Sequence, residues 1–222
     1  MFFSEKIKNI KPADKVLEIG PGGTPHVRAD VFLEKKYETE AAWNSQRGLT
    51  PRLVTSKKVV YYDGGKFPFQ DKEFDYIICS HVIEHVENVE FFVSELFRVA
   101  SKGYIEYPTI LYEYVYNFYV HLNFIKFKND RLYYLKKEDT ALAQFLPVQR
   151  LFHHSLKMGY SRNVENLRHV MFEGFEWQRE FEVTSATSID DLVPEIHEIT
   201  KNESGVNYKT LASIWQKIRS FI

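Results

Sequence analysis

The sequence predicts an α/β fold built on an open, doubly wound and mostly parallel sheet. The first half of the 222-residue chain alternates five short apolar runs with helical or loop segments. These runs are apolar on both faces, which is typical of parallel strands that are covered by helices. The last two runs flank a helical segment and so form a strand-helix-strand unit.

The predicted strands follow one another up to residue 108, over residues 15–20, 29–34, 57–65, 74–80 and 102–108. The third run ends in Asp-Gly-Gly, which is a turn signal. Between the fourth and the fifth run, apolar residues recur at helical spacing from Val89 to Ala100. Asn88 directly precedes them and is the expected N-cap of that helix.

The second half is rich in aromatic residues and predicts a helical insertion before a C-terminal strand hairpin. Leu111, Val115, Phe118, Leu122 and Ile125 form one helical face within 109–139, and 138–158 is expected to be helical too. The segments "RHVMFEGFEW" and "REFEVTS" predict two strands joined by a turn. We expect one domain over 1–222, in which the insertion 109–165 covers the substrate.

Composition restricts the function classes. The 29 basic and 30 acidic residues give a net charge of −1, so the chain as a whole has no attraction for polyanions, and a nucleic-acid partner is not expected. Cys79 is the sole cysteine, which excludes a disulfide within the chain. The N-terminus has no signal-peptide pattern, and no apolar run reaches membrane-spanning length. We expect a cytoplasmic protein without a membrane span.

Three carboxylates stand at or near the ends of successive predicted strands. Glu18 precedes the turn Gly20-Pro21-Gly22-Gly23, Glu34 ends the second strand, and Asp63 ends the third. Ligands of open parallel sheets bind beyond the carboxyl ends of the strands, and glycine lets them approach the backbone closely. We expect the three acids to bind three polar parts of one ligand: an amino-acid group, a ribose and an adenine.

The ordered segments "VLEIGPGG", "ADVFLE", "YYDGGKFPFQDKEFDYIICSHVIEHV" and "GYIEYP" resemble the class I S-adenosylmethionine-dependent methyltransferases, of the type 11-like kind, over residues 13–108. The resemblance implies a Rossmann-like methyltransferase fold and S-adenosylmethionine as cofactor. The cofactor-binding residues that it implies are Glu18, Gly20, Pro21, Gly22, Glu34, Asp63, Gly64, Ser80 and His81.

The sequence departs from the family pattern after the glycine turn. Thr24 takes the third glycine position, Pro25 follows it, and the second strand begins early. The usual first helix must therefore be clipped or replaced by a loop, which leaves open whether Asp30 or Glu34 binds the ribose. We favour Glu34, because Asp30 opens its strand. A nicotinamide dinucleotide fits less well, because the last glycine of G-x-G-x-x-G is missing.

His81 and His85, with Glu84 beside them, would share one helix face, but the metalloprotease spacing and a third ligand are lacking. We therefore predict no metal. His85 and His121 are the candidate catalytic bases on residue type alone. Tyr107, Tyr112 and Tyr116 are candidate substrate residues, although core packing explains them equally well.

These features predict methyl transfer to a small or mid-sized organic acceptor. One alternative is an RNA or protein methyltransferase that uses the basic segment from Lys126 to Lys137, although a solvated cover explains that segment better. Another alternative is a catalytically inactive binding protein with the same fold. The apolar stripe around Trp215 would permit a homodimer.

Overall fold

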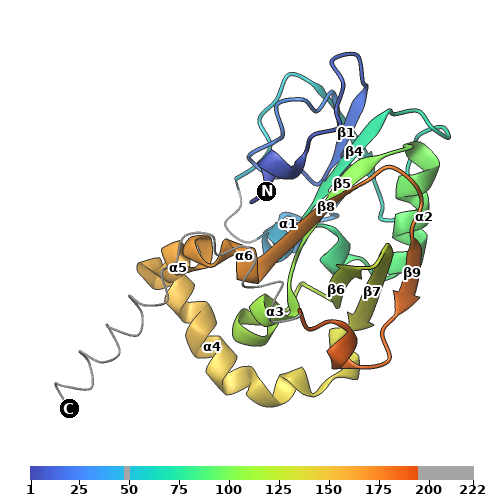
Figure 1. The fold of residues 1–222 in the computed structure, drawn as a ribbon. Helices are drawn as coiled ribbons and strands as arrows, with labels where there is room; N and C mark the ends of the chain where they lie inside the picture. Colours follow the sequence, from blue (N-terminus) through green and yellow to red (C-terminus); the bar gives the residue numbers. More distant parts are fainter. Residues whose placement is uncertain (48–50, 195–222) are drawn as a thin grey trace, which may run out of the picture.

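The computed structural model describes residues 1–47 and 51–194, and its main element is a six-stranded sheet (Figure 1). The strand order is β3-β2-β1-β4-β5-β8, with β8 antiparallel to β5 and all other pairs parallel. The strands are β1 (Val16–Ile19), β2 (Val31–Lys35), β3 (Lys58–Tyr62), β4 (Tyr76–Ser80), β5 (Gly103–Pro108) and β8 (Phe172–Trp177). All five strands predicted in the first half are confirmed.

The central strands form the core because both of their faces are covered. Every residue of β1 and β5 is buried, as are the first four of β4. Helix α2 (Val89–Val99) packs Val93 and Leu96 into the same cluster. The predicted cap is confirmed, because the Asn88 side chain accepts a hydrogen bond from the Phe91 N–H at 2.9 Å.

The connection between β1 and β2 contains no helix, as the sequence predicts. Residues 20–30 form turns and loop instead. The short helix α1 (Glu40–Arg47) follows β2, and its residues reach segments that lie far away in the sequence. Ser45 Oγ lies 2.7 Å from the Tyr119 hydroxyl, for example, which ties α1 to the insertion.

The prediction of a helix throughout 109–139 is wrong. Helix α3 (Ile110–Tyr116) ends at Asn117, which has a left-handed φ of 43°. An antiparallel hairpin follows, with β6 (Asn123–Lys128) paired to β7 (Arg131–Lys136). The two loop residues, Asn129 and Asp130, have φ of 54° and 57°. Asparagine and aspartate tolerate this conformation, and a two-residue loop with positive φ matches the twist of paired strands.

The prediction of a hairpin formed by residues 168–185 is also wrong, because its two strands belong to different sheets. β8 completes the main sheet, whereas β9 (Glu182–Ser185) pairs in parallel with β7 in a three-stranded sheet of order β6-β7-β9 (Figure 1). Phe181 lies between the two strands and packs against Phe97 of α2 and Phe127 of β6 as well as against β8, so it joins the two sheets.

Three further α-helices lie between β7 and β8: α4 (Leu146–Ser155), α5 (Ser161–Asn166) and α6 (Arg168–Met171). The helix expected over 138–158 is thus confirmed in its second half. Short helical turns are η1 (Ser4–Lys6), η2 (Ile83–His85), η3 (Lys137–Asp139), η4 (Ala141–Phe145), η5 (Leu156–Tyr160) and η6 (Ile189–Asp191).

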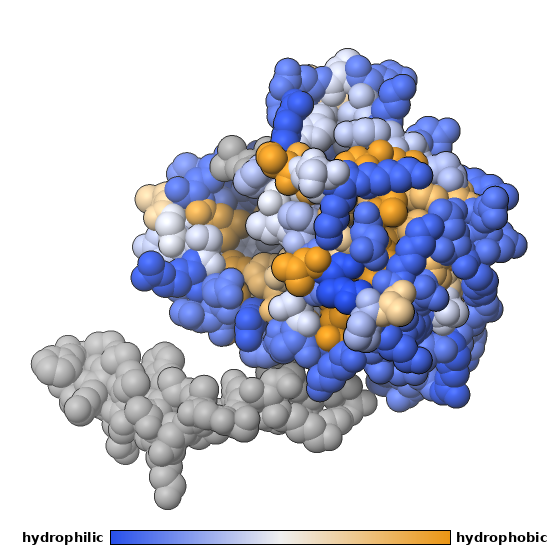
Figure 2. Space-filling model, turned by 90° about the horizontal axis from the view of Figure 1, so that it is seen from above, coloured by the Kyte–Doolittle hydropathy of each residue, from blue (hydrophilic) through white to orange (hydrophobic). Residues whose placement is uncertain are grey.

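The surface seen in Figure 2 is largely hydrophilic, with hydrophobic side chains gathered in separate patches. Among the described residues, no helix has the length and apolar character needed to span a bilayer. The apolar stripe around Trp215, and with it the expected homodimer contact, lies outside the described residues.

Candidate active site

The candidate site lies where the strand order reverses, between β1 and β4. The turn after β1 depends on glycine at this point. Gly20 and Gly22 have φ of 59° and 60°, and a Cβ on Gly20 would stand 2.8 Å from Val82 Cγ2. Glycine is therefore required at position 20, because a side chain there would collide with Val82 in a backbone conformation that other residues rarely adopt.

Glu18 lies within β1 and is 2% exposed. Its carboxylate accepts a hydrogen bond from the His26 N–H at 2.8 Å, which ties the strand to the loop that follows the glycine turn. Burial raises the pKa of Glu18 to about 7 in spite of this bond. A cationic ligand would stabilise the ionised form of this carboxyl group, which agrees with the assignment of Glu18 to the amino-acid group of the cofactor.

Glu34 stands near the carboxyl end of β2 and pairs with Arg47 from the end of α1. It also accepts the Gly22 N–H, and burial still raises its pKa, although Arg47 and Gly22 act in the opposite direction. Arg47 Nη2 is 3.9 Å from where a Cβ of Gly20 would stand, so the guanidinium lies between the glycine turn and Glu34. Asp30 is at the other end of the sheet, where it accepts the Val16 N–H at 2.8 Å.

Asp63 follows β3 and is exposed. Its Oδ1 accepts the Gly65 N–H at 2.9 Å, an arrangement that stabilises the turn at Gly64, whose φ is 103°. Asp63 therefore has a structural role in the turn, and its second oxygen remains available for an adenine amine.

Ser80 and His81 follow β4 and contact Glu106 of β5. The Ser80 hydroxyl donates to Glu106 Oε1 at 2.9 Å, and His81 Nε2 lies 3.0 Å from the same oxygen. His81 Nδ1 lies 3.3 Å from Glu84. Burial opposes the charge of His81, but the nearby carboxylates of Glu106 and Glu84 raise its pKa to about 9.

The expected helix face shared by His81 and His85 is not formed. His81 has a left-handed φ of 55°, and the chain then makes the single helical turn η2. The bend still brings both imidazoles to Glu84, because His85 Nε2 is 3.9 Å from Glu84 Oε1. Glu84 itself is fully buried, and its neighbours His81 and His85 hold its pKa near 2 against the effect of burial.

The two candidate bases, His85 and His121, lie together although they come from distant segments. Their rings meet edge to face with centroids 4.6 Å apart. His121 Nδ1 contacts the Glu113 carboxylate at 2.5 Å, and Lys137 binds the other oxygen of Glu113 at 2.7 Å. Burial lowers the pKa of His85 to about 4, so its ring is neutral at pH 7.

The three candidate tyrosines differ in their surroundings. Tyr107 is 1% exposed, and its hydroxyl donates to Glu173 at 2.8 Å and accepts the Phe127 N–H at 2.7 Å, so it joins β5 to β8 and β6. Tyr112 stacks on Phe118, and Tyr116 is buried in the same aromatic cluster. Phe118 also stacks on His121, so a chain of ring contacts links Tyr112 to the histidine pair.

The basic segment from Lys126 to Lys137 is neutralised within the chain. Its ion pairs are Lys126–Glu173 at 2.7 Å, Arg131–Glu182 at 2.5 Å, Lys136–Glu138 at 3.6 Å and Lys137–Glu113 at 2.7 Å. Such internal pairing leaves little free positive charge to hold a nucleic-acid backbone.

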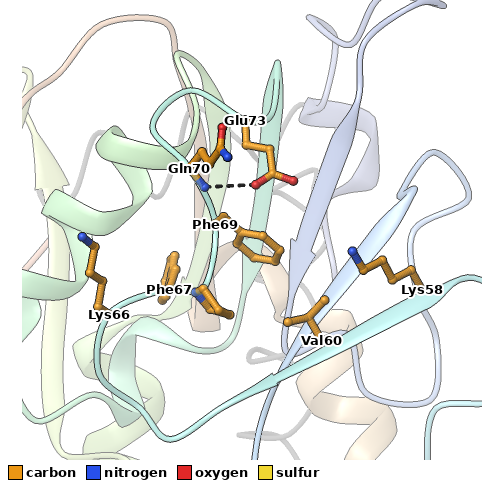
Figure 3. Close-up of a pocket in the computed structure, with 8 residues that line it drawn as sticks. Lys58, Val60, Lys66, Phe67, Phe69, Gln70 and Glu73 are labelled. Atoms are coloured by element: carbon orange, nitrogen blue, oxygen red, sulfur yellow. Dashed lines mark hydrogen bonds between the residues drawn. The ribbon is translucent and has the colours of Figure 1, made fainter.

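A separate pocket opens beside the edge strand β3 (Figure 3). Lys58 and Val60 of β3 line it together with residues 66–70 and 73, and the Gln70 N–H donates to Glu73 at 3.0 Å. None of the predicted site residues borders this pocket, so it is distinct from the glycine turn.

Sequence reasoning missed four polar residues of the site: Arg47, Glu84 as a buried acid, Glu106 and Glu113. Glu106 and Glu113 are both fully buried and lie in apolar segments, "GYIEYP" and "ILYEYVY". An acid within an apolar run is the signal that identified Glu18, and it would have identified these two as well.

Comparison with known proteins agrees with this geometry. Residues 35–105 match the model of a family described as "Methyltransferase domain". A search of curated proteins finds no match. The strand order, the glycine turn at the switch point and the domain match define a class I methyltransferase fold. The domain match agrees with the resemblance of the sequence to the class I S-adenosylmethionine-dependent methyltransferases, whose cofactor is S-adenosylmethionine.

Solved structures of methyltransferases are similar to part of this chain. A putative methyltransferase from Bacillus halodurans C-125 is 22% identical over 53% of this chain and 58% of its own, with a TM-score of 0.39. A possible histamine N-methyltransferase from Thermotoga maritima is 20% identical over 48% and 49%, with a TM-score of 0.33. The chain thus spans about half the length of these structures.

Proposed function

We propose that the chain transfers the methyl group of S-adenosylmethionine to a small or mid-sized organic acceptor. Glu18, the turn from Gly20 to Gly22, Glu34 and Asp63 would hold the cofactor, with Ser80 and His81 beside its methionine end. The proposal is supported above all by the spacing of these groups along β1, β2 and β3, three neighbouring strands of one sheet. The cofactor supplies an electrophilic methyl group.

The acceptor would approach from the side of β4, β5 and α3, under the insertion 109–165. The aromatic cluster around Tyr112 and Phe118 supports an organic acceptor, because flat apolar side chains bind such molecules. The internal pairing of the basic segment argues against RNA. Positioning and exclusion of water account for much of such a transfer, and His85 or His121 would take a proton where the acceptor is a hydroxyl or an ammonium.

The cofactor assignment can be tested by calorimetry with S-adenosylhomocysteine. Glu34→Gln and Asp63→Ala should each weaken binding by about 1–3 kcal/mol, as expected for a lost hydrogen bond to a charged group. Asp30→Asn is the matched control, because Asp30 caps the opposite end of the sheet. A loss with Asp30→Asn but not with Glu34→Gln would assign the ribose to Asp30.

A crystal soaked with S-adenosylhomocysteine gives the direct test. We expect the ribose hydroxyls at Glu34 and the adenine amine at Asp63. Methyl-transfer assays then distinguish an enzyme from a binding protein that has lost turnover. Carboxylates that point away from the bound product would contradict the proposed site.

A further inference from the structure

We propose that Glu84, His85 and His121 form a binding site for a divalent transition-metal ion of the zinc type. One potential ligand atom from each of the three residues lies within 4.8 Å of those of the other two. Two imidazoles and a carboxylate are a ligand set that zinc uses at sites with an open coordination position. This site is separate from the carboxylates proposed to hold the cofactor, and an ion bound there would occupy the histidine nitrogens that otherwise could take a proton from the acceptor.

The first argument is the state of Glu84. It is fully buried, and neither carboxylate oxygen accepts a hydrogen bond within the part of the chain that the structure describes. Its ion-pair contacts are longer, with His81 at 3.3 Å and His85 at 3.9 Å. A buried carboxylate is costly unless it is paired, hydrogen-bonded or bound to a metal ion. Among the described residues, Glu84 thus has ionic neighbours but no hydrogen bond to either oxygen, which leaves both oxygens able to bind a metal ion.

The second argument is that the protein fixes the tautomers of both histidines. His85 Nδ1 lies 3.0 Å from the Val120 carbonyl oxygen, which can only accept, so this nitrogen carries the proton. Gln46 Nε2 lies 2.7 Å from the same nitrogen, so a proton on Nδ1 requires the Gln46 amide to be turned over, which places its oxygen as the acceptor. His121 Nδ1 likewise donates to the Glu113 carboxylate. With Nδ1 carrying a proton, the nitrogen of either ring that can bind a metal ion is Nε2.

The third argument is the outer shell of the cluster. Histidine ligands of metals almost always donate their other N–H to a carboxylate or a backbone carbonyl. Here His121 has the carboxylate of Glu113, which Lys137 holds in place at 2.7 Å, and His85 has the Val120 carbonyl. The side chains of His85 and His121 are 22% and 12% exposed, which gives an ion a path to Glu84.

The sequence did not reveal this site because its third ligand is remote. His81 and His85 suggest a pair by their spacing, but His81 bridges Glu84 and Glu106 instead. His121 comes from the turn after α3, and only the packing of that segment against η2 brings it to His85.

The test is metal uptake by the full chain after treatment with a chelator and without any cofactor. Wild-type protein should bind one Co²⁺ per chain, with visible absorption bands of low-symmetry Co²⁺, and Zn²⁺ should displace it. His85→Gln and His121→Gln should weaken Co²⁺ binding at least 100-fold. Glu113→Gln should weaken it roughly 10–100-fold, because only the outer shell changes. His154→Gln is the control, since His154 is an exposed histidine outside the cluster.

A second measurement needs no variant. Nitrogen-detected NMR of histidine-labelled wild-type protein should show that Zn²⁺ shifts the Nε2 resonances of two of the eight histidines, His85 and His121. Absence of stoichiometric uptake, or uptake that survives both glutamine variants, would overturn the proposal. Because cofactor binding plays no part in either experiment, such a result would leave the methyltransferase proposal intact.

Discussion

The two halves of the carboxyl edge of the main sheet handle buried charge in different ways. On the side of β1 and β2, Glu18 accepts a hydrogen bond from a loop N–H, and Glu34 pairs with Arg47 at the end of α1. Burial raises the pKa values of both acids. On the side of β4 and β5, Glu84 and Glu106 share His81, and their pKa values fall to about 2. On the β1–β2 side, a bound ligand could replace the present partners of the two acids. On the β4–β5 side, the acids belong to a fixed network within the protein.

Breaking the fixed network should give the largest effect. Glu106 accepts from the Phe2 and Phe3 N–H groups and from the Ser80 and Tyr104 hydroxyls, and it forms an ion pair with His81 at 3.0 Å. Glu106→Gln replaces one acceptor oxygen with an NH₂ group that faces donors, so the free energy of unfolding should fall by about 3–5 kcal/mol. Urea unfolding measures this loss.

Glu182→Gln is the matched control for that substitution. Glu182 pairs with Arg131 at the surface, and its side chain is 58% exposed, so the same chemical change should cost less than about 1 kcal/mol. Equal losses in the two variants would show that the β4–β5 network is no more sensitive than the surface.

The next effect is a pH dependence that belongs to the same network. The folded-state pKa of His81, about 9, lies above its unfolded value of 6.5. Its charge therefore stabilises the fold fully below pH 6.5, and this contribution is lost as the pH rises through 9. The difference in unfolding free energy between wild type and His81→Gln should shrink over this window by on the order of 3 kcal/mol.

Unfolding titrations from pH 6 to pH 10 measure this difference, and subtracting the variant removes groups that titrate alike in both proteins. The partners of His81 behave in the opposite sense, because the lowered pKa values of Glu84 and Glu106 stabilise the fold above pH 4.5 and lose that effect towards pH 2. A constant difference from pH 6 to pH 10 would mean that His81 is not the charged link between them.

The comparison of the two halves also explains what the sequence could predict. The strands in residues 1–108, helix α2 and its Asn88 cap follow from local apolar patterns and a local hydrogen bond. Glu18 and Glu34 stand out as acids at strand ends. The sequence predicted a helix in place of the hairpin β6–β7 because its apolar residues can be read with a helical period, and the turn signal at Asn129-Asp130 was not used.

The partners of the candidate site residues, on both sides of the sheet edge, depend on contacts between distant segments, which no local pattern encodes. His121 reaches His85 only because the chain reverses at Asn117, and Arg47 reaches Glu34 only because α1 returns to the end of β2. Neither reversal produces a periodic signal in the sequence. Residue types therefore identified the candidate bases, while their partners required the fold.

A smaller effect should come from the glycine turn on the cofactor side. Gly20→Ala places a side chain at φ 59° and a Cβ 2.8 Å from Val82 Cγ2. The left-handed conformation costs about 1–2 kcal/mol, and the close contact adds to it. Gly159→Ala is the control, because Gly159 has φ 94° and no atom within 4 Å of the added Cβ. Gly20→Ala alone should also weaken S-adenosylhomocysteine binding. If both variants bind the product like the wild type, the turn does not approach the ligand.

The smallest effect tests whether the partner of Glu34 is exchangeable. Arg47 now binds the carboxylate that we propose for the ribose, so the cofactor must displace it. Arg47→Ala removes the competitor, and S-adenosylhomocysteine should bind about five-fold more tightly, the equivalent of about 1 kcal/mol. Arg52→Ala, which breaks the exposed pair with Glu40 at 2.8 Å, is the control and should leave affinity unchanged. Weaker binding by Arg47→Ala, measured by calorimetry, would instead make Arg47 a cofactor ligand and the β1–β3 half as fixed as the other.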